Sequence, residues 1–351
     1  MKVGVFPGKF LPPHRGHITA ILRAHALCDK LYVVVSERTA EDGELCRSAG
    51  IGYISGVLRQ RWLSQELQGL GIEVLLQNED AMAPFPQGWA DYAALLKHTV
   101  SEPFVVIFGG EESYRDGHSR HFPGIDYTVL DPQRTQWPIS GTEIRNHPSL
   151  HWDYIAGAAR PFFARKVLIT GPESCGKTTL TRKLAKVYCT SWSEELGRDY
   201  QQDVVGGNGD LFEPEDFNRI AHLQYEQDLK ALRSANKVCF FDTDAVVTAF
   251  FSKAFSGAVA NRVGSFIDPG KYDLVIALQP TVPWVADGMR ELGEQATREL
   301  SFTGLMELYR QYGFDTDSFV IIAAPDYYTR LEGCISAVES LLYAKGPAIA
   351  S

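Results

Sequence analysis

Two short segments of the chain combine glycine with basic side chains in patterns that bind phosphate groups. Residues 8–17 read GKFLPPHRGH and residues 171–178 read GPESCGKT, and each segment comes at the end of a hydrophobic run. The first pattern is suited to attack at the α-phosphorus of a nucleotide, whereas the second is suited to transfer of the γ-phosphoryl group. We therefore expect two successive ATP-dependent steps in one chain.

The first segment brings two imidazoles to the start of a predicted helix. His14 and His17 lie three positions apart, so both rings can face the same side. The N-terminus of the helix adds backbone N–H groups and a positive dipole end. Downstream, residues 139–145 read ISGTEIR and contain two hydroxyl groups and an arginine. We expect a second helix to begin in this segment, with its N-terminus pointing at the same phosphates. Two ordinary loop histidines are the alternative interpretation, which these flanking residues weaken.

The second segment matches the P-loop pattern between a strand and a helix. Lys177 is expected to reach the β- and γ-phosphates, and Thr178 is expected to bind Mg²⁺. A strand that ends in an acidic residue should accompany it, and residues 238–244, VCFFDTD, fit that expectation. Asp242 is the better magnesium ligand, while Asp244 is either a substrate contact or a helix cap. The alternative is a P-loop that binds nucleotide without turnover.

Other kinase residues are expected in two further segments. Residues 194–199, EELGRD, lie where small-molecule kinases often place a substrate clamp or a base. Residues 283–290, PWVADGMR, resemble a lid segment with a phosphate-binding arginine, for which we prefer Arg290 to Arg298. The general base stays open among Glu195, Asp242 and Asp244.

One cysteine of the P-loop carries a separate hypothesis. Cys175 precedes Gly176 at the expected helix start, and a thiol near a helix N-terminus tends toward a lowered pKa. We therefore expect Cys175 to be alkylated readily without nucleotide and to be protected by ATP. The alternative is a small filler residue with an inaccessible sulfur.

Charge and composition exclude several partners. The formal net charge is −9 and there is no run of lysine or arginine, so we expect no nucleic-acid partner. The six cysteines form no C-x-x-C pair, which fits a reducing cytoplasm. No signal segment and no stretch of about 18 apolar residues is found, so we expect no membrane insertion. We predict a cytoplasmic protein with small-molecule ligands, and we leave homo-oligomerisation open.

Short hydrophobic runs alternate with amphipathic stretches along the chain. On the first predicted helix, Ile18, Ile21 and Leu22 follow the spacing of a core-facing stripe. The expected strands cover residues 3–6, 31–35, 72–76, 104–108, 166–170, 238–241, 274–278 and 319–322. The expected helices begin near residues 16, 57 and 89 and later cover about 215–234, 296–312 and 330–344.

This alternation predicts an α/β fold with two mainly parallel sheets, a Rossmann-like sheet and then a P-loop sheet. The chain has 351 residues, which is comfortable for two domains. We place the boundary within residues 150–165, which gives domains 1–160 and 161–351. Ligands of open parallel sheets bind beyond the carboxyl ends of the strands, where both phosphate-binding segments fall.

The first half resembles the nucleotidylyltransferase superfamily, and most of all nicotinamide mononucleotide adenylyltransferases. The resemblance rests on G-x-F-x-P-x-H-x-G-H followed by I-S-x-T-x-I-R. It implies that the 5′-phosphate of nicotinamide mononucleotide attacks ATP without a protein nucleophile. It also implies nicotinamide mononucleotide contacts from Asn78 and from Trp89, whose ring would stack on the pyridinium or, alternatively, belong to the core. The implied ATP contacts are Gly8, Lys9, Phe10, His14, His17, Ser140, Thr142 and Arg145.

The second half resembles the ribosylnicotinamide kinase domain of NadR proteins, in the P-loop and in the later acidic and lid-type segments. Phosphorylation of nicotinamide riboside yields the substrate of the first half, so the two resemblances support each other. Magnesium would be held by Thr178 and Asp242. The implied ATP contacts are Gly171, Glu173, Ser174, Cys175, Gly176, Lys177, Thr178, Thr179 and Arg290. The implied nicotinamide riboside contacts are Trp192, Glu195, Arg198, Tyr225 and Asp244.

These observations predict a bifunctional NAD salvage enzyme with ATP as co-substrate and Mg²⁺ as cofactor. Two alternatives stay open. The first is a transferase–kinase fusion for another cofactor precursor, of flavin or coenzyme A type, because H-x-G-H also occurs in those transferases. The second is a nucleotide-sensing module in which one site only binds.

Overall fold

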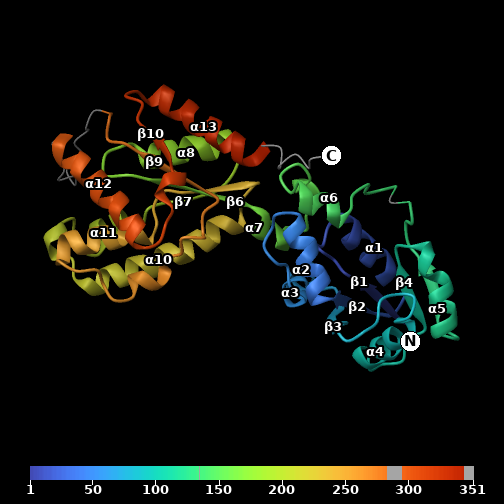
Figure 1. Ribbon diagram of the computed structural model, residues 1–351. Helices are drawn as coiled ribbons and strands as arrows, with labels where there is room; N and C mark the ends of the chain where they lie inside the picture. The colour runs from blue at the N-terminus through green and yellow to red at the C-terminus, as the bar shows by residue number, and fades with distance from the viewer. Residues whose placement is uncertain (134, 283–294, 344–351) are drawn as a thin grey trace. The chain divides into compact units, whose positions relative to one another are not determined.

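The protein is described by a computed structural model over residues 1–133, 135–282 and 295–343 (Figure 1). The chain divides into two compact units, Met1–Phe162 and Phe163–Ser351. Each unit contains one five-stranded sheet in which all neighbouring strands run parallel. In these described ranges, no helix has the length and apolar character needed to cross a membrane.

The sheet of the first unit has the order β3-β2-β1-β4-β5. Strand β1 lies at its centre and pairs with β2 on one side and β4 on the other. The order therefore changes direction between β1 and β4, which is where open α/β sheets bind their ligands. The strands are β1 Val3–Gly8, β2 Lys30–Glu37, β3 Glu73–Asn78, β4 Val106–Gly109 and β5 Asp126–Val129.

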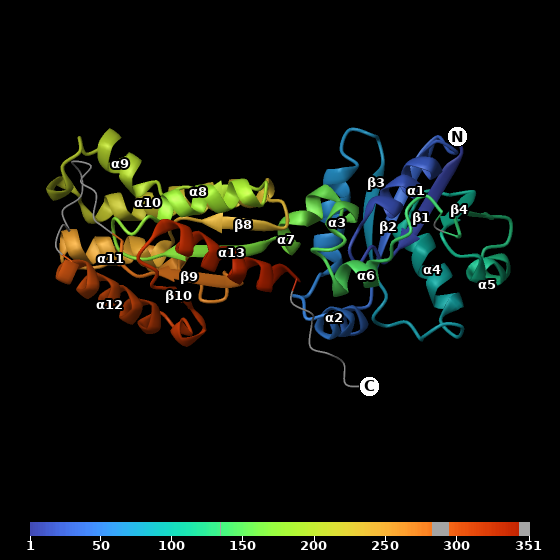
Figure 2. The same cartoon turned by 90° about the horizontal axis from the view of Figure 1, so that it is seen from above.

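Helices cover both faces of this sheet (Figure 2). Helices α1 Arg15–His25 and α3 Gly56–Glu66 pack on one face, and α4 Trp89–Thr99 packs on the other. Ile21 of α1 is fully buried, whereas Leu22 is 41% exposed, so the expected core position of Leu22 is wrong. The remaining α-helices of the unit are α2 Thr39–Ser48, α5 Arg115–His121 and α6 Gly141–Asn146, and the short α7 Arg160–Phe163 spans the boundary between the two units.

The sheet of the second unit has the order β10-β9-β6-β8-β7, with β6 at its centre. Strands β6, β8 and β9 are rich in valine, isoleucine, leucine and phenylalanine, as expected for strands covered on both faces. The strands are β6 Arg165–Thr170, β7 Trp192–Ser193, β8 Val238–Phe241, β9 Leu274–Leu278 and β10 Val320–Ile322.

The helices of the second unit form two layers around its sheet. Helices α8 Lys177–Val187 and α13 Tyr327–Tyr343 pack on one face. The other face is covered by α10 Pro214–Arg233, α11 Ala245–Ser256 and α12 Gln295–Gln311. A short helix, α9 Gly197–Asp203, follows β7.

The predicted fold class is confirmed, but two edge strands escaped prediction. Strand β7 has only two residues, and β5 has four residues that are half-buried or exposed. Neither carries the continuous apolar run that marks the central strands. Both take their strand character from the neighbour that they pair with, so the local sequence gives little signal.

Candidate active sites

The two predicted histidines lie together where β1 leads into α1. We call residues 8–17 the histidine loop. His14 caps α1, and its Nδ1 accepts the backbone N–H of His17 at 3.4 Å. The two imidazole rings stack with their centroids 3.6 Å apart, and the ring of Phe10 meets His17 edge-on at 5.0 Å. Both imidazoles therefore lie on one side of the loop, as their spacing predicts.

The ISGTEIR segment packs directly against the histidine loop. Ser140 caps α6 and forms a capping box with Glu143. Arg145 is buried, and its Nη1 donates to the carbonyl of Leu11 while Nη2 donates to Thr142 Oγ1 at 3.0 Å. Gly141 permits this approach, because a Cβ there would lie 2.5 Å from the carbonyl oxygen of Leu11. The two segments, far apart in sequence, thus form one wall.

A cavity of about 720 Å³ opens along this wall. Its lining includes every residue predicted to contact ATP in this unit: Gly8, Lys9, Phe10, His14, His17, Ser140, Thr142 and Arg145. A volume of this size fits a nucleotide-sized ligand. The histidines and the hydroxyl groups of Ser140 and Thr142 contribute polar groups to the lining, and this concentration of donors suits a polyphosphate.

Aromatic rings also line the same cavity. Trp89 lies 4.8 Å from the ring of Phe85 and 5.1 Å from that of His118. Burial lowers the pKa of His118 to about 4, so this imidazole is neutral at pH 7. Asn78 is not among the lining residues, and its side-chain amide instead holds a turn with Asp80. The structure therefore brings Trp89, but not Asn78, to the cavity, and Trp89 also packs against the core of the first unit, as the alternative interpretation expects.

The P-loop, residues 171–178, joins β6 to α8 as predicted. Gly176 has a φ of 85° and Gly171 a φ of 145°, conformations that glycine adopts without strain. Lys177 is 8% exposed, and its Nζ donates to the carbonyls of Gly171 at 3.0 Å and Pro172 at 3.1 Å. Burial lowers the pKa of Lys177, but nearby negative charge, including Glu195, outweighs it and leaves the pKa raised. The ammonium is therefore charged at the loop.

Asp242 lies at the end of β8, next to the P-loop. Its side chain is 1% exposed, and Oδ2 has no hydrogen-bond partner among the described residues. Burial and the charge of Glu195 raise its pKa to about 7, while Lys177 and the hydroxyl of Thr178 oppose that rise. A buried carboxylate oxygen without a donor, beside a threonine hydroxyl, fits a magnesium ion that also binds phosphate.

Asp244 is a helix cap. Its Oδ1 accepts the backbone N–H of Val247 at 3.0 Å at the start of α11, and also the hydroxyl of Tyr309 at 2.9 Å. The same hydroxyl lies 2.9 Å from Thr170 Oγ1, at the end of β6. Burial raises the pKa of Asp244 to about 6. The capping alternative is thus confirmed, and a substrate contact stays a prediction.

Several predicted kinase residues lie elsewhere or make other contacts. Tyr225 is 42% exposed on α10, and its ring lies 5.6 Å from Phe266. Trp192 donates to Glu194 Oε1 at 3.2 Å and packs against the core beneath α8 and α13. Glu195 and Arg198 form a loose pair at 3.9 Å. Arg290 lies outside the described residues. Thr179 is exposed, in contrast to the buried Lys177.

The hypothesis of a reactive Cys175 is wrong in its physical basis. The side chain is 1% exposed and belongs to the core between α8, α13 and the sheet. Its Sγ donates to the carbonyl of Pro172 at 2.9 Å, and burial raises the pKa of the thiol. Desolvation raises the pKa of the thiol more than the helix N-terminus lowers it, because the sulfur points into the core.

Two buried arginines at the loops were missed by sequence reasoning. Arg59 of α3 and Arg330 of α13 donate to loop carbonyls, of Lys9 and of Cys175. A signal was present in both helices, because each arginine falls on the buried stripe of its helix. The buried positions are 56, 59, 62 and 63 in α3 and 330, 334, 338 and 342 in α13.

Comparison with known proteins covers both units. A family model described as an AAA domain matches residues 166–330. The trifunctional NAD biosynthesis/regulator protein NadR of Salmonella typhimurium (strain LT2) is 35% identical over 351 residues, covering 98% of this chain and 84% of that protein. Two crystal structures of NadR protein are also similar at 26% identity. The complex with NR has a TM-score of 0.80 and covers 99% of this chain and 98% of that one. The complex with NAD and AMP-PNP has a TM-score of 0.79 and covers 100% and 98%.

The sequence similarity thus extends over nearly the whole chain, including the histidine loop, the ISGTEIR segment and the P-loop. The chain belongs to the NadR family of NAD biosynthesis enzymes, and it carries an adenylyltransferase domain and a P-loop kinase domain.

Proposed function

We propose that the protein converts nicotinamide riboside to NAD in two steps. The second unit phosphorylates nicotinamide riboside with ATP, which gives nicotinamide mononucleotide. The first unit then adenylylates that product with a second ATP, which gives NAD and pyrophosphate. The observation that carries the proposal is the cavity of the first unit, whose lining combines a phosphate-binding wall with aromatic rings. The NadR crystal structures in complex with NR and with NAD and AMP-PNP support the same substrates.

In the first unit, the chemistry needs positioning and charge stabilisation. The 5′-phosphate of nicotinamide mononucleotide attacks the α-phosphorus of ATP, and pyrophosphate leaves. His14 and His17 would donate hydrogen bonds to the phosphates as negative charge develops. Trp89 would stack on the cationic pyridinium ring, and the neutral His118 beside it adds no like charge.

In the second unit, the buried groups divide the work between them. Lys177 would hold the β- and γ-phosphates, and Thr178 with Asp242 would hold Mg²⁺, which neutralises phosphate charge. Oδ1 of Asp244 is already engaged by Val247 and Tyr309. Glu195 is then the remaining candidate to accept the proton of the 5′-hydroxyl as that oxygen attacks the γ-phosphorus.

A substrate panel tests this proposal. The purified full chain is given ATP and Mg²⁺ with nicotinamide riboside, riboflavin, pantetheine or choline, and phosphorylated products are followed by mass spectrometry. Of the four compounds, we expect only nicotinamide riboside to be phosphorylated, and we expect NAD to form from its product. Faster turnover of riboflavin or pantetheine would assign the enzyme to another cofactor. Binding of nicotinamide riboside without any product would favour a sensing module.

A further inference from the structure

Arginine provides the three largest side chains that are fully buried among the described residues: Arg59, Arg298 and Arg330. Burying such a charged group is costly unless it is paired and hydrogen-bonded. Each of the three donates to a carbonyl of one of the two phosphate-binding loops. The proposed chemistry uses none of these guanidinium groups, so their burial needs another explanation.

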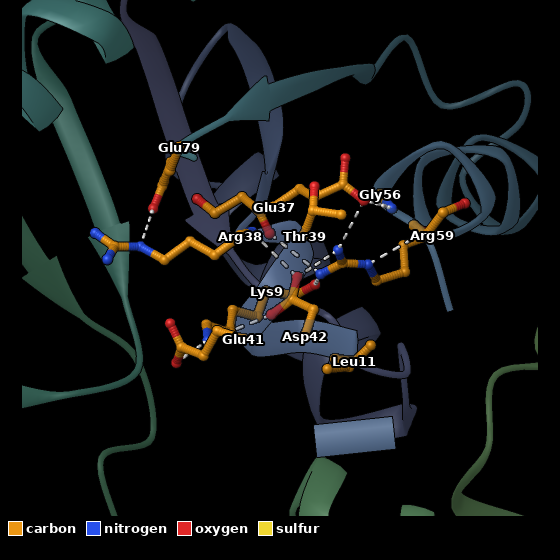
Figure 3. A network of polar contacts seen from close by, with 12 residues as sticks. Lys9, Leu11, Glu37, Arg38, Thr39, Glu41, Asp42, Gly56, Arg59 and Glu79 are labelled. Atoms are coloured by element: carbon orange, nitrogen blue, oxygen red, sulfur yellow. Dashed lines mark hydrogen bonds and ion pairs between the residues drawn. The ribbon is translucent and has the colours of Figure 1, made fainter. Parts of the chain in front are cut away.

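Arg59 connects the histidine loop to its surroundings (Figure 3). Its Nη1 donates to the carbonyl of Lys9 at 2.6 Å and to that of Ser36, in β2, at 3.1 Å. Its Nη2 donates to Asp42 Oδ2 at 2.7 Å, and both side chains of this pair are 0% exposed. Asp42 also lies 3.4 Å from the ammonium of Lys9. One guanidinium thus fixes the loop to strand β2 and to helix α2.

Arg330 makes the corresponding contacts in the second unit. Its Nη1 donates to the carbonyl of Cys175 at 2.7 Å. Its Nη2 donates to the carbonyl of Gln279, just after β9, and to Thr281 Oγ1 at 2.8 Å. Its Nε donates to the carbonyl of Ala324, just after β10, at 2.8 Å. One guanidinium therefore fixes the P-loop to the segments that follow two neighbouring strands.

The two arginines differ in how their charge is balanced. Arg59 is paired with the carboxylate of Asp42. Arg330 has no carboxylate within ion-pair distance in the described part of the chain, where its side chain donates to carbonyls and to one hydroxyl. Among the described residues, Arg330 therefore adds positive charge near the P-loop without a carboxylate partner, whereas the role of Arg59 is mainly geometric.

Loop geometry explains why N–H donors to the loop carbonyls matter at both sites. A loop that turns its N–H groups toward phosphate directs carbonyl groups away from the ligand, into the protein. A buried carbonyl without a donor costs about 1–3 kcal/mol. The planar guanidinium of arginine spreads its N–H donors over three nitrogens and can bridge carbonyls of separate segments, whereas lysine donates from a single nitrogen. The guanidinium groups thus hold each loop in a shape that suits phosphate.

We propose that Arg59 and Arg330 are positioning residues for the two ATP sites, Arg59 for adenylyl transfer and Arg330 for the kinase. Neither touches the reacting atoms; each acts through the backbone of its loop. The proposal rests on the two activities of the chain, and the substrates proposed above serve as reporters of those activities.

The test compares R59K, R330K and the control R61K in the full chain. Arg61 lies on α3 two positions from Arg59 but is exposed. We expect R59K to lower kcat/KM for ATP in adenylyl transfer by up to about 100-fold, which is what a displacement of reacting groups by about 1 Å can cost. Its KM for ATP should rise while its KM for nicotinamide mononucleotide stays within about twofold of wild type. R330K should likewise raise the KM for ATP in the kinase reaction and leave the KM for nicotinamide riboside nearly unchanged, and R61K should match wild type in both reactions.

A merely structural role gives a different pattern. Loss of folded protein lowers the apparent kcat in proportion to the fraction that is unfolded, and it leaves the KM values for ATP and for the second substrate unchanged. That result in R59K or R330K would overturn the proposal. Equal kcat/KM for ATP in R59K and R61K would overturn it too. Calorimetric titration with a non-hydrolysable ATP analogue provides a readout that needs no second substrate. There, each variant should weaken one of the two binding events. If wild type binds the analogue but turns over neither proposed substrate, the proposed function fails. The affinities of R59K and R330K for the analogue would then still show whether the two arginines position the ATP-binding loops.

Discussion

Replacement of Asp244 by asparagine should stabilise the second unit at neutral pH. Asparagine caps helices about as well as aspartate, and its Oδ1 can accept the same two hydrogen bonds from Val247 and Tyr309. What the substitution removes is a buried charge. Asp244 is 3% exposed, and burial raises the pKa of its carboxyl group from 3.8 to about 6.

The sign and size of the effect follow from this pKa. Because the folded-state pKa is raised, the contribution of Asp244 to stability is most favourable below pH 3.8, where the group is protonated in both states, and is lost as the pH rises to about 6. A rise of about two pH units corresponds to about 3 kcal/mol, as an upper estimate. The advantage of D244N should therefore be about 3 kcal/mol at pH 8 and about half that at pH 5. For a domain of this size, 1 kcal/mol moves Tm by about 2–4 °C.

The assay must report on the second unit alone. The full chain is heated in steps, digested briefly with thermolysin, and analysed by mass spectrometry of peptides from α10 and α11, at pH 5 and pH 8. Asp326 provides a matched control, because it accepts the N–H of Thr329 at 2.8 Å and hydrogen bonds lower its pKa. D326N should therefore stabilise at neither pH. A Tm gain for D244N that is the same at both pH values, or no gain, would refute the buried-charge account.

Three further predictions concern the sites themselves. G141A should lower the rate of adenylyl transfer by about 10- to 100-fold and leave the kinase rate unchanged, because the added Cβ would lie 2.5 Å from the carbonyl oxygen of Leu11. Steady-state rates of both activities check this, and an unimpaired adenylyl transfer would contradict it. Burial and the charge of Glu195 raise the pKa of Asp242, which must be ionised to bind Mg²⁺, so E195Q should shift magnesium-dependent nucleotide binding toward lower pH. Calorimetry across pH checks this, and a pH dependence that stays the same or moves upward would contradict it. Cys175 should react slowly with iodoacetamide whether or not ATP is present, whereas the exposed Cys189 should react fast. Labelling is followed by peptide mass spectrometry, and rapid labelling of Cys175 that ATP prevents would contradict its burial.

Local motifs made the main features of the fold and of both loops predictable. The histidine loop, the P-loop and the acidic end of β8 each contain several informative residues within a few positions. Their predicted strand and helix contexts agree with the structure. The meeting of the ISGTEIR segment with the histidine loop was also predictable, since both carry phosphate-binding residue types.

Features that depend on distant contacts were not predictable in this way. Proximity to a helix N-terminus was visible for Cys175, but the direction of its sulfur into the core was not. Tyr225 suits a stacking role by residue type, yet only the structure shows its ring beside Phe266. Arg59 and Arg330 lie on buried helix stripes, but the carbonyls that they bind come from other parts of the chain.

The central claim is that the two loops act in a fixed order, the P-loop first and the histidine loop second. The most direct measurement follows products by mass spectrometry when K177A and H17A are each given nicotinamide riboside, ATP and Mg²⁺. We predict that H17A stops at nicotinamide mononucleotide, and that K177A makes nothing from nicotinamide riboside but makes NAD when nicotinamide mononucleotide is supplied. If K177A makes no NAD from nicotinamide mononucleotide, or if H17A still makes NAD, the assignment of the two steps is contradicted.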